Sequence, residues 1–124
     1  MAVTYTTAVK NARLNAVITA IGTTGVLEIG TAGMATVLAT INLANPAGTS
    51  ASGVLTFSGF PRSDTSADNT GTAAAARIRT ASGGTDIVTG LTVGTSGADI
   101  ILDSVSITQG QQVTINSASI THAP

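Results

Sequence analysis

Residues 36–43 read TVLATINL, and this stretch decides the fold class of the chain. Four of its five apolar side chains stand at every second position, at Val37, Ala39, Ile41 and Leu43. Side chains at every second position lie on one face of a β-strand, so the pattern predicts a strand with one buried face. Working outward, the apolar runs at residues 26–29 and 54–60 predict two further strands.

The remainder of the chain continues in the same manner. Further strands are expected at residues 72–80, 86–93, 100–102, 105–107 and 113–121, and loops are expected at residues 45–53 and 61–71. The alanines of residues 72–80 also suit a helix. Gly71 before them and the Gly83-Gly84 pair after them favour a strand.

The last expected strand, residues 113–121, changes its apolar phase between Ile115 and Ile120, which predicts a bulge near Ser117. Short strands at roughly ten-residue spacing, divided by glycine-rich turns, are typical of antiparallel sheets. We therefore expect an all-β fold, an antiparallel β-sandwich or jelly roll, with one N-terminal α-helix. The length of 124 residues indicates a single domain, with an arm and helix at residues 1–22 and the sandwich at residues 23–124.

The helix is expected at residues 7–21, where the apolar spacing changes to that of a helix. Its larger apolar side chains form one stripe, consisting of Leu14, Val17, Ile18 and Ile21. Small residues form a second face, consisting of Val9, Ala12, Ala16 and Ala20. Thr6 or Thr7 suits the start and Gly22 suits the end. The bulky stripe is expected to pack on the sheet of its own chain or on a neighbouring subunit.

Charged residues make up only 9% of the chain, against about 25% in a typical soluble domain. The chain also has no cysteine and only one histidine, so it offers few groups for catalysis or metal binding. The net charge of −1 argues against nucleic-acid binding, and no apolar stretch is long enough to span a membrane. Lys10 and Arg13 fall where a signal peptide would be apolar, so secretion by that route is not expected.

Few residues are candidates for chemistry. Asp64, Asp68 and Asn69 could together ligate a cation, but Asx-rich loops usually cap their own turns, so no metal is predicted. Asp99 and Asp103 are expected to cap turns. His122 is the sole candidate general base, and its place near the end of the chain favours no catalytic triad. No glycine-rich phosphate motif is present either. Because the chain shows neither a triad nor such a motif, we predict no catalytic residue and no cofactor.

A charge-poor surface and a core limited to Val, Ile and Leu indicate a subunit that packs against other proteins. Alanine supplies 20 of the residues counted as hydrophobic, so the core is expected to be thin. Arg77 and Arg79 are two apart and would share one strand face, where they could pair with nearby aspartates or contact an acidic partner. The candidate interface residues are Leu14, Val17, Ile18, Ile21, Arg62, Arg77 and Arg79.

Both ends of the chain resemble a group of small tailed-bacteriophage virion proteins. At the N-terminal end the resemblance lies in Tyr5-Thr6-Thr7, in NARLNAV at residues 11–17, in Ile21-Gly22 and in GVLEI at residues 25–29. At the C-terminal end it lies in VGTSGADI at residues 93–100, in Gly110-Gln111, in VTI at residues 113–115 and in ITH at residues 120–122. Together these segments mark the two ends of the chain, which make up about half of its length.

The resemblance implies a non-enzymatic component of a phage particle, above all a head decoration, or cement, protein on the capsid. Its expected partners are the major capsid protein or other virion proteins, and copies of itself in a symmetric homo-oligomer, with a trimer favoured. The expected location is the virion, assembled in the host cytoplasm. A tail, collar or fibre-attachment protein is one alternative. A glycan-binding adhesin that uses Tyr5 is another, and a pocket joining His122 to an acid and a serine would indicate an enzyme.

Overall fold

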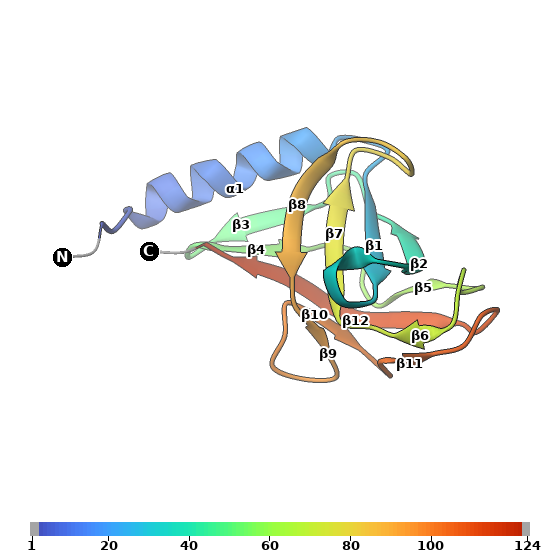
Figure 1. Ribbon diagram of the computed structural model, residues 1–124. Helices are drawn as coiled ribbons and strands as arrows, with labels where there is room; N and C mark the ends of the chain where they lie inside the picture. The colour runs from blue at the N-terminus through green and yellow to red at the C-terminus, as the bar shows by residue number, and fades with distance from the viewer. Residues whose placement is uncertain (1–2, 123–124) are drawn as a thin grey trace.

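The apolar alternation of residues 36–43 forms a strand that pairs with the strand before it, and this pair begins a fold made mostly of β-sheet. The computed structural model describes residues 3–122 (Figure 1). Its helices are α1 (Thr7–Ile21) and the short 3-10 turn η1 (Ala32–Met34). Its strands are β1 (Val26–Gly30), β2 (Val37–Asn42), β3 (Gly48–Ala51), β4 (Val54–Phe57), β5 (Arg62–Asp64), β6 (Gly71–Thr72), β7 (Ala75–Arg79), β8 (Asp86–Leu91), β9 (Val93–Gly94), β10 (Ile100–Leu102), β11 (Ser106–Ile107) and β12 (Val113–Thr121). The prediction of a β-rich chain with one N-terminal α-helix is confirmed.

The first sheet has the order β2-β1-β7-β8, and each pair in it is antiparallel. Leu27 pairs with Ile41 on one side and with Ile78 on the other. Ile29 pairs in the same way with Ala39 and Ala76. Residues paired across antiparallel strands point to the same face, so these side chains form one continuous apolar surface. All of them are buried.

The second sheet has the order β3-β4-β12-β10-β9, and β5 also pairs with β12. Its pairs are antiparallel except for β9 and β10, which run parallel. Opposite β12, Ile101 pairs with Ser117 while Leu102 pairs with Ile115, so Asn116 is an extra residue. The predicted bulge near Ser117 is thus confirmed. A small third sheet joins β6 to β11.

One apolar core collects side chains from both larger sheets and from α1. From the second sheet and its neighbours come Leu55, Phe57, Ile100, Leu102, Val113, Ile115 and Ala118. Its large members are almost all Leu, Ile and Val, as the composition suggested, with Phe57 as the single buried aromatic residue among those described. Among the described residues Glu28 is the one buried charged side chain, at 5% exposure.

Helix α1 packs across β3, β4 and β8, where it lies along one side of the sheets (Figure 1). Thr6 caps its start by accepting a hydrogen bond from the Val9 N–H at 3.4 Å. Gly22 ends it in the left-handed region, at φ 65°, which glycine adopts without strain. Leu14 and Ile21 are buried, so the bulky stripe packs on the sheets of its own chain.

Two expected loops contain strands. Residues 45–53 include β3, which pairs with β4 through a turn with left-handed backbone at Ser52 and Gly53. Its sequence, GTSA, lacks large apolar residues, so no alternation indicates it. Residues 61–71 likewise include β5 and the start of β6. The expected strand at 72–80 is shorter, as β7, and the one at 86–93 divides into β8 and β9 around Thr92.

Candidate functional site

The polar segment at residues 62–69, here called the strap, lies along the outer edge of β2. From Arg62, Nη1 donates a hydrogen bond to the carbonyl oxygen of Asn42 at 3.0 Å. The backbone N–H of Thr40 donates to Asp64 Oδ2, also at 3.0 Å. Because β2 ends its sheet, these backbone groups have no strand partner on this side. The strap therefore satisfies an edge that would otherwise be open.

The second half of the strap continues along the same edge. The backbone N–H of Asp68 donates to the carbonyl oxygen of Leu38 at 2.7 Å. The Asn69 side-chain amide donates to the carbonyl oxygen of Val37 at 2.9 Å. The residues weighed as cation ligands thus hold the β2 edge. Across residues 3–122, no three histidine, cysteine, aspartate or glutamate side chains are placed to hold a metal ion together.

A ladder of charged side chains crosses the outer face of the first sheet. Arg77 Nε lies 2.6 Å from Glu28 Oε1, and Arg79 Nη1 lies 3.7 Å from the same oxygen. Arg79 Nε also lies 2.9 Å from Asp86 Oδ1. The two arginines share one strand face, as their spacing predicted, and the four charges balance. Glu28 is a member that sequence reasoning missed, although a glutamate inside the apolar run VLEI is a visible signal.

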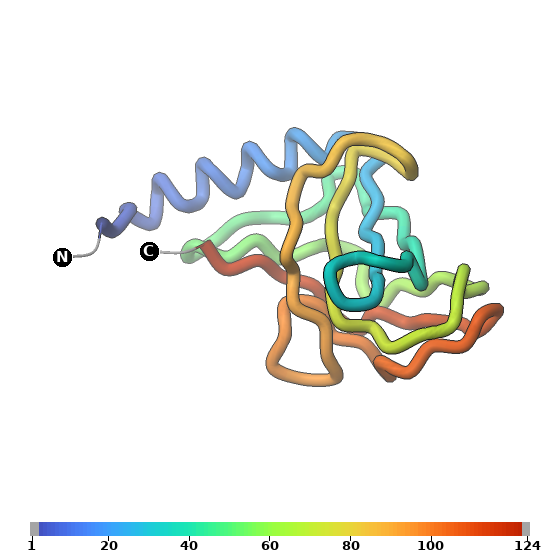
Figure 2. Tube along the Cα trace, in the orientation of Figure 1, coloured from blue at the N-terminus to red at the C-terminus, as the bar shows by residue number. Residues whose placement is uncertain are grey.

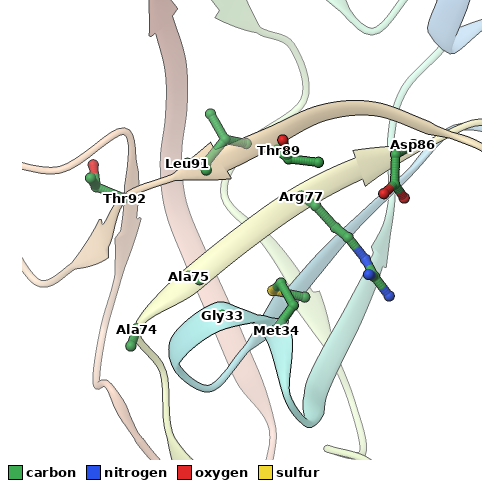
Figure 3. A pocket seen from close by; sticks show the side chains of 10 residues that line it. Gly33, Met34, Ala74, Ala75, Arg77, Asp86, Thr89, Leu91 and Thr92 are labelled. Atoms are coloured by element: carbon green, nitrogen blue, oxygen red, sulfur yellow. The ribbon is translucent and has the colours of Figure 1, made fainter.

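An open groove of about 450 Å³ runs beside this ladder, between η1 and β8 (Figure 3). Met34 lies on one side of β7, Thr89 and Leu91 lie on the other, and Ala75 lies between them. The Arg77–Asp86 end of the groove is polar, and the rest is lined mainly by small or apolar residues. Sequence reasoning did not find this groove, because it depends on how η1 folds back over β7.

The N-terminal arm, residues 3–6, meets the C-terminal end of the chain. The Arg13 guanidinium carbon lies 4.7 Å from the centre of the Tyr5 ring. On the same ring, His122 packs edge-on with its centroid 5.8 Å away. The backbone N–H of His122 donates to the carbonyl oxygen of Gly53 at 2.9 Å. His122 therefore joins Tyr5 of the arm to the turn at Gly53. Figure 2 shows the start of α1 and the end of β12 on the same side of the molecule.

The large hydrophobic residues that the described chain leaves exposed all fall in residues 3–9. They are Val3 at 77%, Tyr5 at 40% and Val9 at 43% exposure. The small-residue face of α1 continues this surface, with Ala12, Ala16 and Ala20 exposed. Of the candidate interface residues on the helix, Leu14 and Ile21 are buried and Val17 and Ile18 are half-buried within the chain. The outward face of α1 is thus formed by Val9 and the exposed alanines, and not by the bulky stripe proposed as an interface.

The comparisons with known proteins add no relative. No protein-family model, curated protein sequence or solved structure matches the chain. Within residues 3–122, no helix combines the length and apolar character needed to cross a membrane.

Proposed function

We propose that this protein is a non-enzymatic structural component of a tailed-phage particle, and specifically a head decoration protein that binds the capsid lattice. One structural observation carries the proposal: the exposed large hydrophobic residues gather in residues 3–9, on a surface poor in charge. Single apolar residues scattered over the surface are normal on a soluble monomer, whereas exposed large apolar residues confined to one short segment favour a contact surface. The resemblance of both chain ends to small phage virion proteins supports the same assignment.

We further propose that the two larger sheets form a β-sandwich of jelly-roll type. The support is that their apolar faces contribute to a single core cluster, in which Ile29 and Ile78 of one sheet join Leu55 and Ile115 of the other. A rigid body of this kind would present its contacts in a fixed geometry. Many identical weak contacts across a lattice add through avidity, so such a protein needs little affinity at any one of them.

The proposed partners are the major capsid protein and other copies of this chain, in a symmetric homo-oligomer for which a trimer is favoured. The contacts that the arginine side chains make within the chain favour protein partners over nucleic acid. Arg77 and Arg79 are paired with Glu28 and Asp86, and Arg62 is bonded to the backbone of β2. Carboxylates thus neutralise Arg77 and Arg79, and Arg62 donates to a strand carbonyl, so these arginines form no cluster of free cations that would suit a phosphate backbone.

Immunogold electron microscopy on particles of the phage that encodes the chain tests the proposal. Antibodies against the purified protein are expected to label the whole head, and prior incubation with that protein should abolish the label. Label at a single vertex would support the alternative, a tail, collar or fibre-attachment protein. Intact particles that carry no label and, by mass spectrometry, none of this chain would contradict a structural role in the particle.

A glycan-binding adhesin is the remaining alternative, and the exposed ring of Tyr5 beside Arg13 is the feature that favours it. Aromatic faces commonly stack on sugars, and here Arg13 already covers part of this ring. Binding to a glycan array that is lost in Tyr5→Ala and retained in Val9→Ala would support the adhesin. The absence of reproducible array binding would leave the decoration protein as the better proposal.

A further inference from the structure

The two edge strands of the first sheet, β2 and β8, differ in how their backbone groups are hydrogen-bonded. At β2 the strap supplies hydrogen-bond partners to the backbone at Val37, Leu38, Thr40 and Asn42. At the opposite end of the sheet, β8 has β7 as its only strand partner within residues 3–122. Along β8, Thr89 and Gly90 are exposed. An exposed strand edge is a template for another strand, and proteins usually block it.

The groove described above adjoins this edge. Its volume of about 450 Å³ is bounded on one side by Thr89 and Leu91 of β8 and on the other by Met34 (Figure 3). Ala75 leaves space between them because its side chain is small. The charges at one end are already balanced by the Arg77–Glu28 and Arg79–Asp86 pairs. An occupant without charge can therefore be buried here without leaving a charge unpaired.

The same chain carries a segment that fits such a place. Residues 3–6 read VTYT, four residues that favour β-strands, and they lie outside any strand. Val3 exposes 77% of its surface, which is the highest value among the exposed large hydrophobic residues. Thr6 already has extended backbone, at φ −66° and ψ 157°. The arm carries no charged side chain.

The arm leaves the molecule in a direction that favours contact with another copy. Figure 1 shows the first turns of α1 projecting beyond the strands, with the N-terminal end on the side away from η1. Tyr5 is held between Arg13 and His122, which fixes the root of the arm at that end. The described start of the arm thus lies away from the groove of its own chain.

We propose that the N-terminal arm of one copy binds the groove between η1 and β8 of a second copy. Val3 enters the groove beside Thr89, and the arm backbone that follows it pairs with the free edge of β8. This inference rests on the homo-oligomer in the proposed function and names its contact. It does not depend on where the protein sits on a particle. A contact between two different surfaces is head-to-tail, and it forms a closed ring only when the rotation between copies closes. The favoured trimer is the ring that this inference expects.

Analytical ultracentrifugation of purified variants tests the contact. The unmodified chain is expected to form a closed oligomer, whereas a chain lacking residues 2–4 and a Thr89→Lys variant should each be monomers. The first variant keeps its groove and the second keeps its arm. Their mixture is therefore expected to form a heterodimer and nothing larger. Thr56→Lys, an exposed threonine on a strand paired on both sides, is the matched control and should assemble like the unmodified chain.

Disulfide trapping gives an independent readout, because the chain has no cysteine of its own. Oxidation of a Thr4→Cys, Thr89→Cys double variant is expected to produce covalent oligomers up to the size of the ring. The control pair, Thr4→Cys with Thr56→Cys, is expected to give no more cross-linking than either single variant. Equal cross-linking in the two double variants would contradict the proposed contact.

Three results would overturn the proposal. The first is an unmodified chain that stays monomeric at millimolar concentration. The second is an oligomer that survives removal of residues 2–4, which would point to direct pairing of two β8 strands instead. The third is a mixture of the two defective variants that remains monomeric while circular dichroism shows both to be folded. None of these results bears on labelling of the phage head, so the two proposals can fail separately.

Discussion

Glu28 illustrates at the scale of a single residue how this chain handles its few charges. A carboxylate exposed to only 5% is costly to bury unless it is paired. Arg77 supplies the near partner at 2.6 Å and Arg79 the distant one at 3.7 Å. Both arginine side chains are about one-fifth exposed, whereas that of Glu28 is almost fully buried. The arginines therefore lie between the carboxylate and the solvent. The charge of Glu28 is therefore tolerated in an otherwise apolar strand.

Removing the near partner should be costly. Arg77→Met leaves Glu28 buried beside Arg79 alone, and we expect the free energy of unfolding to fall by about 2 kcal/mol, the scale of a hydrogen bond to a charged group. Urea denaturation followed by circular dichroism measures it. The double variant Glu28→Leu, Arg77→Met should recover most of that loss, because no buried charge remains.

Asp86→Asn is the matched control for this ladder. The Asp86 side chain is 44% exposed, and exposed ion pairs contribute little, so we expect a loss below about 0.5 kcal/mol. A loss at Asp86 as large as that at Arg77 would show that burial of Glu28 does not govern the ladder.

At the scale of elements, α1 and the strap show what sequence periodicity can and cannot predict. The helix stripe and both helix ends follow from spacing and capping residues, so they are predictable. The role of the strap depends on hydrogen bonds to backbone groups of a strand 20 or more residues away, as from Arg62 to Asn42. Every residue carries a backbone carbonyl group, so the sequence does not indicate which of them accepts such a bond. For the same reason β3, whose residues are small and polar, was expected as a loop.

The helix stripe supports a second prediction. Leu14 is 3% exposed within the core, so Leu14→Ala should lower the free energy of unfolding by about 3 kcal/mol through lost burial and a residual cavity. Val9→Ala removes apolar volume from the exposed face of the same helix and should change it by less than about 0.5 kcal/mol. Thermal denaturation at a low concentration measures both. Equal losses would mean that the helix does not pack by this stripe.

The strap supports a third prediction, on aggregation. The double variant Asp64→Ala, Asn69→Ala removes the side chains that bond to β2 at Thr40 and Val37. We expect the opened edge to pair with other molecules, so that mild heating produces thioflavin-positive aggregates sooner than in the unmodified chain. Ser66→Ala, with an exposed side chain in the same segment, is the control. Unchanged aggregation in the double variant would argue against edge protection.

At the scale of the whole molecule, most charged side chains are used within the chain. Ion pairs, hydrogen bonds or ring contacts engage Arg13, Glu28, Arg62, Asp64, Arg77, Arg79, Asp86 and Asp99. The Asp99 carboxylate accepts from the Thr92 N–H at 3.0 Å and so joins the two ends of the loop at residues 92–99. Few charged groups on the surface are therefore available to a partner, fewer than the sequence alone suggests. The interface candidates Arg62, Arg77 and Arg79 already have hydrogen-bond or ion-pair partners within the chain.

Stability should therefore depend on assembly. Any contact made only by folded copies stabilises the folded state by mass action, so we expect the melting temperature to rise with protein concentration. Differential scanning calorimetry over a hundredfold range of concentration measures the effect. The chain lacking residues 2–4 should show no such dependence, whereas Thr56→Lys should retain it. A melting temperature independent of concentration in the unmodified chain would contradict assembly in solution.

The meeting of Tyr5 and His122 has a consequence for rebuilding the chain. Because Tyr5 and His122 are in contact, a short linker could join the two ends, and new ends could be opened between Ser82 and Gly83, which are both exposed. Such a circular permutant would keep every strand pairing of the fold. Its arm would become an internal connection that cannot reach out, which separates the ability to fold from the ability to assemble.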